Sequence, residues 1–149
     1  MSRSLRKEKN RERLIEYVLE EAKIDPEFLE SISQYIPFDQ PNRYIGDNKE
    51  DFLQGKIKGL KVKENGEFVG HILYDFNGEE FHWLSCHGRS NTGFPLSPKI
   101  FEMVKTYAFK NLGAKYITAA TIRKPLIHFL TQQGAHISEV FLTILPDEQ

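Results

Sequence analysis

Two stretches near the start of the chain have apolar residues at helical spacing. Leu14, Ile15, Val18, Leu19 and Ala22 recur every three to four positions, as on one face of a helix. Asp25 and Pro26 then have the order of a helix N-cap and a first helical residue, and a second apolar face follows. The pattern predicts a first helix from residue 14 to near residue 23 and a second over residues 26–36, within an N-terminal helical segment that spans residues 1–36.

The middle of the chain has the composition of β-strands. Residues 57–63, 68–76 and 80–86 are rich in β-branched and aromatic side chains, and Asn-Gly pairs separate them at 65–66 and 77–78. Three antiparallel strands are predicted. Strict alternation would put Val69, His71, Leu73 and Asp75 on one face, and Phe68, Gly70, Ile72, Tyr74 and Phe76 on the other. Before them, residues 37–49 read as a loop and 51–54 as a helical turn or an edge segment.

The last third of the chain alternates helices with strands. A helix over residues 98–112 is predicted between Ser97, a candidate N-cap, and Gly113. Residues 116–120 form a short strand, which the intervening helix allows to lie parallel to residues 81–86. A helix over 124–133 and a strand over 138–145 complete an α/β (α+β) fold, with a mixed sheet and helices on both faces.

Composition and charge narrow the class of protein. A chain of 149 residues with 40% hydrophobic and 28% charged residues suits one domain with a buried core. No apolar run has the length of a membrane span and the first residues are charged, so a cytoplasmic protein without membrane contact is expected. The net charge of −1 gives no reason to expect nucleic-acid binding, although residues 1–13 are basic.

A polar loop between the third strand and the following helix is a candidate anion site. It contains Arg89, Ser90, Asn91, Thr92 and Gly93. The first turn of a helix offers unpaired N–H groups and a positive dipole end, and a flexible loop with an arginine stands just before it. The sequence therefore predicts a site for an anion such as a phosphate.

From about residue 56 to residue 145, the order of elements resembles that of the GCN5-related N-acetyltransferases (GNATs). In that family the loop reads Arg or Gln, two residues, Gly, one residue, then Gly or Ala. The sequence Arg89-Ser90-Asn91-Thr92-Gly93-Phe94 keeps the arginine and one displaced glycine, and ends on a bulky residue. The resemblance implies an acetyl-CoA co-substrate, with the pyrophosphate held by residues 89–93. It also implies a pantetheine arm along the main chain of Leu84, Ser85 and Cys86, and it places Arg123 where the family has an asparagine near the cofactor.

The same resemblance suggests which residues would carry acetyl transfer to an amine. GNATs often place the base on the strand before the loop, where this chain has Glu80, His82 and His87. A histidine suits the role because its ordinary pKa lies near neutrality. The general-acid tyrosine common in the family would stand four residues before Gly134, and this chain has Leu130 there.

Two alternatives to the transferase come into question, and only the second remains open. A zinc site formed by His82, Cys86 and His87 is disfavoured, because alternation puts His82 and Cys86 on one face and His87 on the other. The second alternative is a catalytically inactive GNAT-like protein with a structural or interaction role. Small bacteriophage proteins resemble this case, since their last helix shares the pattern of Phe129-Leu130 followed by Gly134-Ala135. Neither the acceptor nor the oligomeric state follows from the sequence.

Overall fold

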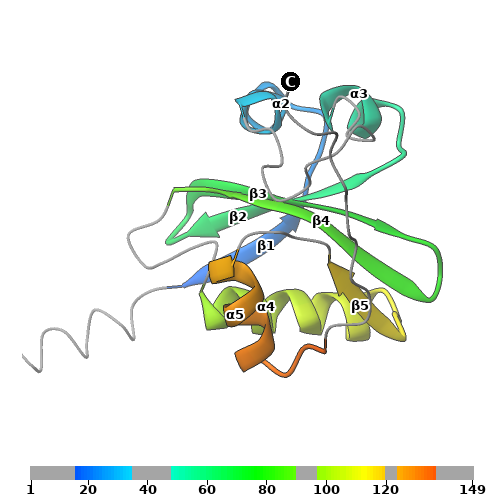
Figure 1. Cartoon of the computed structure of the whole chain (residues 1–149). Coiled ribbons are helices and arrows are strands. Elements are labelled where there is room, and N and C mark those ends of the chain that lie inside the picture. Colours follow the sequence, from blue (N-terminus) through cyan, green and yellow to red (C-terminus); the bar gives the residue numbers. More distant parts are fainter. Residues whose placement is uncertain (1–15, 35–47, 90–96, 120–123, 137–149) are drawn as a thin grey trace, which may run out of the picture.

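The fold is built on a mixed sheet with helices on both of its faces. The computed structural model describes residues 16–34, 48–89, 97–119 and 124–136. Within these ranges the sheet has five strands in the order β1-β2-β3-β4-β5. Figure 1 shows helices α2 and α3 above the sheet and helices α4 and α5 below it. The predicted fold class, an antiparallel meander with one parallel strand pair, is confirmed.

The first described element is a strand, which corrects the helix predicted from residue 14 to near residue 23. Strand β1 (Tyr17–Glu21) pairs antiparallel with β2 (Lys58–Glu64), so that Leu19 lies opposite Val62. Tyr17 is buried and Leu19 half-buried, while Val18 and Glu20 are exposed. This two-residue alternation coexists with the helical spacing in the sequence, and pairing with β2 decides between them.

Helix α2 (Pro26–Gln34) begins where the sequence predicts. A carboxylate oxygen of Asp25 accepts a hydrogen bond from the N–H of Phe28 at 2.8 Å, which is an N-cap interaction. That hydrogen bond lowers the pKa of Asp25, and Lys61 at 3.2 Å also lowers it. The cap and the ion pair fix the start of α2 above β2. The predicted extension of this helix to residue 36 lies outside the described residues.

The predicted hairpins are confirmed. Asn65 and Gly66 both have positive φ angles, 51° and 83°, and join β2 to β3 (Glu67–Phe76). At the next turn the side chain of Asn77 accepts hydrogen bonds from the N–H groups of Glu79 and Glu80, and β4 (Glu80–Gly88) follows. Two positive φ angles favour asparagine and glycine, which explains why the sequence signal is reliable here.

Two β-bulges interrupt the strict alternation that the sequence suggests. One falls where the partners of Val62 and Lys63 are Gly70 and Phe68, so that Val69 is the extra residue. As a result Phe68 packs on the α2 side and Val69 on the α4 side, the reverse of the predicted assignment. The second bulge, at Leu84 in β4, is described with the site.

The two faces of the sheet carry separate cores. The face toward α4 (Pro98–Thr106) holds the larger cluster, which includes Leu60, Ile72, Phe81, Ile100 and Val104. The opposite face packs against α2 and the short helix α3 (Asn48–Leu53) through a cluster of Phe28, Ile32, Phe52, Ile57 and Leu73. On this second face the ring of Phe28 lies so close to Gly59 that a Cβ atom there would stand 2.3 Å from it. A glycine is therefore required at residue 59.

The predicted helix over 98–112 is one continuous element with an irregular end. Regular α4 gives way to a π-helical turn, η1 (Tyr107–Asn111), before Gly113 at a φ of 77°. The hydroxyl of Tyr107 bonds that of Tyr74 at 2.9 Å and donates to Glu21 at 3.2 Å. Burial and these bonds raise the pKa of Tyr107 above its ordinary range. The wide turn thus connects the helix to β3 and to the edge strand β1.

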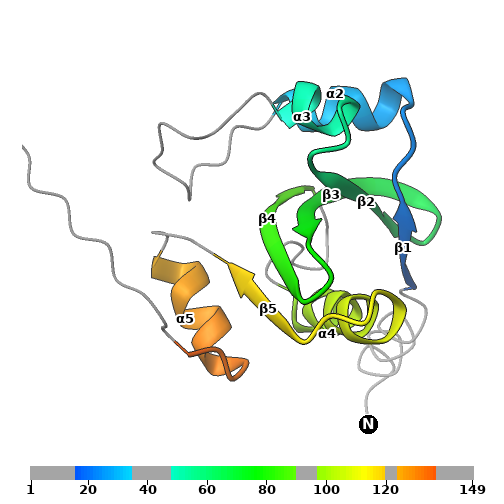
Figure 2. The same ribbon diagram turned by 90° about the vertical axis from the view of Figure 1, so that its right-hand side faces the viewer.

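The last described elements extend the sheet on its other edge. Strand β5 (Tyr116–Ala119) runs parallel to β4, and helix α5 (Lys124–Gln132) follows it and ends before Gly134. Figure 2 shows β5 at the edge of the sheet, with α5 beyond it. The strand predicted over residues 138–145 lies outside the described residues.

Candidate functional site

Strand β4 is much longer than its parallel neighbour β5. The two strands pair only from Glu80 to Trp83, opposite Tyr116 to Ala119, whereas β4 continues to Gly88. Among the described residues, no strand pairs with residues 84–88 on that side. This part of β4 therefore extends beyond its parallel neighbour, and an extended ligand could lie along it in the manner of an added strand.

A β-bulge marks the point at which the pairing with β5 ends. Leu73 pairs with Ser85 and Tyr74 with Trp83, so Leu84 is an extra residue in β4. His82 and His87 consequently lie on the α2 side, while Cys86 packs on the α4 side near Ile72. The predicted alternation, with His82 and Cys86 on one face and His87 on the other, is wrong because a bulge shifts every later residue by one position.

The three residues predicted to receive the pantetheine arm lie at this bulge. Leu84 packs against the α2-side cluster and Cys86 against the α4-side cluster. Ser85 is buried, and its hydroxyl has no hydrogen-bond partner among the described residues. Its carbonyl accepts a hydrogen bond from the indole N–H of Trp83 at 3.2 Å. The only tryptophan of the chain therefore reports directly on the main chain of β4.

The predicted phosphate loop begins at the end of β4. The N–H of Arg89 donates to the carbonyl of Val69 at 2.7 Å, which extends the β3–β4 ladder by one step, and its side chain is exposed. Ser90, Asn91, Thr92 and Gly93 lie outside the described residues, as does Arg123. The structure resumes at Ser97, which has an extended N-cap conformation, although its hydroxyl makes no capping hydrogen bond. The helix start is thus where the sequence predicts it.

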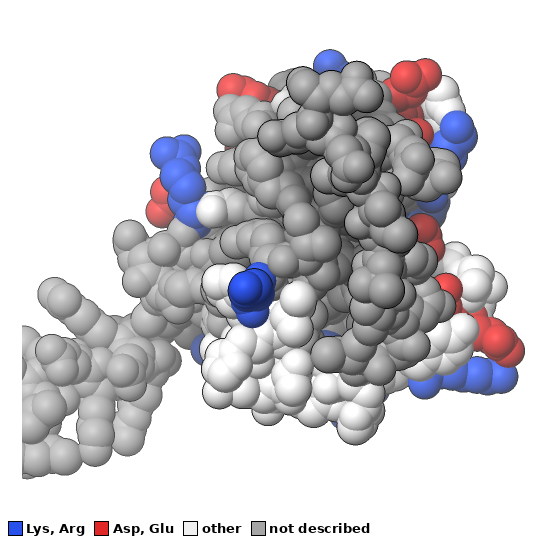
Figure 3. Space-filling model, in the orientation of Figure 1, with Lys and Arg blue, Asp and Glu red and all other residues white. Residues whose placement is uncertain are grey.

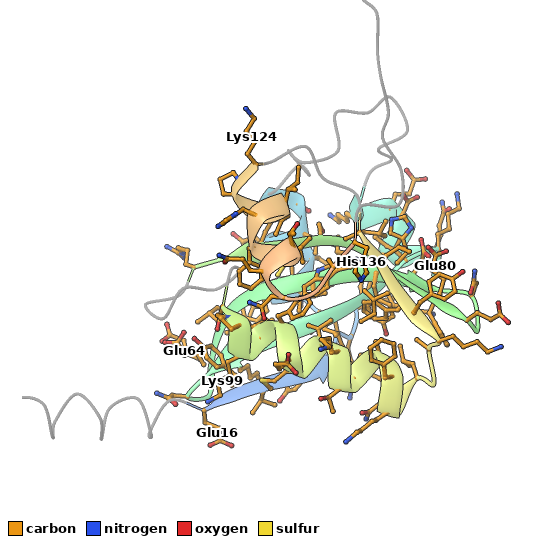
Figure 4. All side chains as sticks on the ribbon, turned by 60° about the horizontal axis from the view of Figure 1, so that its bottom comes forward. Glu16, Glu64, Glu80, Lys99, Lys124 and His136 are labelled. Carbon is orange, nitrogen blue, oxygen red and sulfur yellow. The ribbon has the colours of Figure 1, made fainter. Side chains whose placement is uncertain are left out.

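The structure does not bring the three predicted bases together. Glu80 accepts a hydrogen bond from Thr118 on β5, and His82 lies between Asp75 on β3 and Thr118. Because a strand rises about 3.3 Å per residue, Glu80 is on the order of 20 Å from His87. Figure 4 shows Glu80 far across the molecule from Lys99 in the first turn of α4. Only His87 lies at the end of β4 that leads into the loop.

A residue that the sequence analysis did not single out lies next to His87. His71 on β3 is the Cα partner of His87, and the two rings are 5.7 Å apart between centroids. His71 is fully buried, with its Nδ1 2.8 Å from the hydroxyl of Ser31 on α2. Burial, with a smaller effect of His87, lowers the pKa of His71 from 6.5 to about 3. A signal was present, since a titratable residue interrupts the apolar run between Phe68 and Tyr74.

Among the described residues, neither a cluster of metal ligands nor a patch of like charges marks this site. No group of three or more histidine, cysteine, aspartate or glutamate residues within the described ranges could hold a metal ion. Acidic and basic side chains of the described residues lie along the rim of the face in Figure 3, and a basic side chain also lies nearer its middle. Among the described helices, none is long and apolar enough to cross a membrane. The basic residues 1–13 lie outside the described part.

The fold has well-defined structural relatives. No protein-family model and no curated protein matches the sequence. Among solved structures, the N-acetyltransferase PseH of Campylobacter jejuni, in complex with acetyl coenzyme A, aligns with a TM-score of 0.63 at 14% identity. The alignment covers 85% of this chain and 92% of that one. The chain has the GNAT fold.

Two further structures with this GNAT fold differ in their described roles. One is a ribosomal-protein-alanine N-acetyltransferase from Brucella melitensis, with a TM-score of 0.59 at 14% identity over 89% of this chain and 99% of that one. The other is a transcriptional regulator from Bacillus halodurans, with a TM-score of 0.60 at 13% identity over 87% and 99%. At these identities the likeness establishes the GNAT fold, and function must be argued from the site.

Proposed function

We propose that the protein is an N-acetyltransferase that transfers an acetyl group from acetyl-CoA to an amine of a small molecule or a protein. One observation carries the proposal. Strand β4 bulges at Leu84 and continues past the end of its pairing with β5. PseH, which has a similar structure, was crystallised with acetyl-CoA. A long, extended cofactor arm could pair with such a strand, as an added strand does.

The cofactor would extend along β4 from the bulge at Leu84 to the loop that follows the strand. Leu84, Ser85 and Cys86 would receive the pantetheine arm through their main-chain groups. Arg89 and residues 90–93 would hold the pyrophosphate beside the first turn of α4, together with the dipole of that helix. Main-chain N–H groups near the bulge would polarise the thioester carbonyl, which needs no particular side chain.

The second candidate function is an inactive GNAT-fold domain with a structural or interaction role. The substitution of leucine at residue 130 favours it, because an aliphatic side chain cannot protonate the departing thiolate. The Bacillus halodurans relative shows that the fold is also found in a protein described as a regulator. Calorimetry with acetyl-CoA distinguishes the two, since only the transferase requires the cofactor.

The decisive measurement compares acetyl-CoA binding by the wild type and by Arg89→Ala. We expect a loss of affinity of about tenfold, because a charge-assisted contact to a phosphate contributes about 1.5 kcal/mol or more. Lys110→Ala removes an exposed positive charge from η1 and serves as the matched control, with affinity expected to stay within about twofold. Equal affinities for wild type and Arg89→Ala would remove Arg89 from the site, and no binding by any of the proteins would contradict the transferase.

Trp83 offers an independent readout of the same site. Its indole N–H donates to the carbonyl of Ser85, on the strand that the pantetheine arm would follow. We expect acetyl-CoA to change the tryptophan emission with the same half-saturation as the calorimetric titration. Emission that does not respond to saturating acetyl-CoA would place any bound cofactor away from the bulge.

A further inference from the structure

Strand β1 forms one edge of the sheet. It pairs with β2 on one side, and among the described residues no strand pairs with it on the other side. Figure 2 shows β1 at the edge opposite to that of β5. All five residues of β1 pair with β2 in a continuous register, and none of them is a proline. A regular edge strand of this kind is a template for pairing with another chain.

The ladder with β2 shows which main-chain groups of β1 face outward. The carbonyl of Glu16 accepts a hydrogen bond from the turn after β2, and the N–H of Ala22 donates to β2. In an antiparallel pair, every second residue directs both its N–H and its C=O to the same neighbouring strand. The even-numbered residues of β1 therefore face β2, whereas Tyr17, Leu19 and Glu21 direct their main-chain groups away from it.

A second copy of the chain fits this edge when the two β1 strands run antiparallel about a two-fold axis at Leu19. This axis places Leu19 opposite the partner's Leu19 and Glu21 opposite the partner's Tyr17, so that residues with outward-facing main-chain groups meet. It is the one axis that pairs all five residues of β1 with β1 of the partner. It also keeps glutamates apart, whereas an axis at Glu20 or at Glu21 would put two identical carboxylates opposite each other.

The side chains at the two ends of β1 complement each other across this axis. The ammonium group of Lys99 lies 5.6 Å from the centre of the Tyr17 ring. Since the partner's Glu21 would lie opposite Tyr17, its carboxylate would come next to this ammonium group. Figure 4 shows two further charged residues near this end of β1, Glu16 and Glu64. The described charges here are acidic overall once the partner's Glu21 is added.

The residues before β1 bring the cations that this acidic end needs. Residues 1–13 contain six basic and two acidic residues. Antiparallel pairing puts the start of each β1 beside the end of the other, next to the partner's residues 20–27, which contain four acidic and one basic residue. Lys61 and Lys63 on β2 offset only part of that charge. Each copy thus carries both halves of a complementary pair, which favours a second copy over an unrelated chain.

We propose that the protein forms a homodimer in which the β1 strands of two copies pair antiparallel about Leu19 and join the two sheets into one. The interface is isologous, because each copy contributes the same strand. Strand β5 and the exposed part of β4 belong to the opposite half of the sheet. The dimer therefore leaves both candidate sites accessible, and it does not depend on the proposed function.

Substitutions at Val18 test the pairing through the sign of one charge. Val18 is 37% exposed and would lie opposite the partner's Glu20. Val18→Glu then sets two carboxylates opposite each other at two symmetric positions, whereas Val18→Lys sets an ammonium group opposite a carboxylate. In sedimentation equilibrium of the full chain, we expect a wild-type dimer, and a Kd for Val18→Glu at least about tenfold above that for Val18→Lys.

A matched control separates this contact from a general effect of added charge. Leu53 on α3 is 44% exposed and lies away from β1, on the far side of α2 from the sheet edge. Leu53→Glu should leave the dimer Kd within about twofold of wild type. Circular dichroism confirms that each variant is folded before its mass is measured.

Hydrogen exchange of single backbone amides tests the ladder itself. In the dimer the N–H of Leu19 would donate to the partner's Leu19, whereas the N–H groups of Val18 and Glu20 face β2 in both states. Nuclear magnetic resonance should therefore find exchange at Leu19 slowed by at least about tenfold between dilute monomer and concentrated dimer. Exchange at Val18 and Glu20 should change far less, which makes these two amides an internal control.

Three results would overturn the dimer through β1. The first is wild-type protein that remains monomeric up to about 1 mM. The second is a dimer whose Kd is equal in Val18→Glu and Val18→Lys, or which Leu53→Glu weakens as much as Val18→Glu does, since the contact would then lie elsewhere. The third is an amide of Leu19 that is already protected in dilute monomer, because a segment of the same chain would then cover the edge.

Discussion

The two faces of strand β4 carry different kinds of residue. Toward α4 the strand presents Phe81, Trp83 and Cys86, which pack on the larger hydrophobic cluster. Toward α2 it presents four polar residues beside Leu84, namely Glu80, His82, Ser85 and His87, of which Ser85 and His87 are buried. The apolar face holds the strand in the sheet, and the polar face carries the groups with chemistry. One strand can therefore be both core and site, provided that its faces are kept apart.

The largest expected effect tests the apolar face. Phe81 is fully buried and its ring stacks on that of Tyr74 at 4.6 Å. Phe81→Ala should lower the free energy of unfolding by about 3–5 kcal/mol, through lost burial and the cavity left behind. His82→Ala changes the next residue, which points to the other face and is only half-buried, and should lower it by less than about 1 kcal/mol. Equal losses in urea unfolding would contradict the division between faces.

The close contact between Phe28 and Gly59 tests how tightly α2 lies on the sheet. Gly59→Ala should lower the free energy of unfolding by about 1–3 kcal/mol, because the new methyl group meets a buried ring. The effect should shrink in a Phe28→Leu background, where the ring is absent. Additive effects of the two substitutions in a double-mutant cycle would contradict the contact.

The polar face should make stability depend on pH. The pKa of His71 is about 3 in the folded protein and near 6.5 when unfolded, so the unfolded chain binds a proton first as the pH falls. The stability from neutral, buried His71 is therefore complete above pH 6.5 and decreases toward pH 3. Between pH 7 and pH 5 the loss should be about 2 kcal/mol. Urea unfolding of His71→Gln should lack this part of the loss, and an unchanged pH dependence would contradict it.

The smallest expected effect concerns the start of α2. Asp25→Ala removes the cap on the N–H of Phe28 and should lower the free energy of unfolding by about 1 kcal/mol. Glu27→Ala removes only the longer contact to Lys61 from an exposed side chain and is the matched control, with an expected change below about 0.5 kcal/mol. Thermal unfolding of both variants provides the comparison, and equal shifts would show that the cap contributes nothing specific.

Local signals in the sequence predicted most of the fold. The N-cap at Asp25, the Asn-Gly turn after β2 and the glycine after η1 each impose a backbone geometry on their neighbours. Strand β1 was predicted as a helix because its apolar spacing fits both periods, and only pairing with β2, about forty residues away in the chain, decides the outcome. Non-local pairing of this kind leaves no signature in a single segment.

The site was less predictable than the fold, for a reason visible at Leu84. The sequence pointed to the correct strand and to His87, but the bulge at Leu84 decides which side chains share a face. No residue type in that strand predicts a bulge, since leucine, serine and cysteine are all compatible with a regular strand. His71 escaped notice because its role depends on a partner in another strand.

The extra residue at Leu84 also has a genetic consequence. Loss of a single codon there would leave a regular strand of nearly the same composition, and the ladder with β3 could close without a gap. Each residue beyond the deletion would keep its partner in β3 and therefore its face, so that Ser85 would follow Trp83 directly and His87 would still lie opposite His71. A three-nucleotide deletion could thus remove the bulge, and with it the proposed place of the thioester, while it leaves the rest of the architecture unchanged.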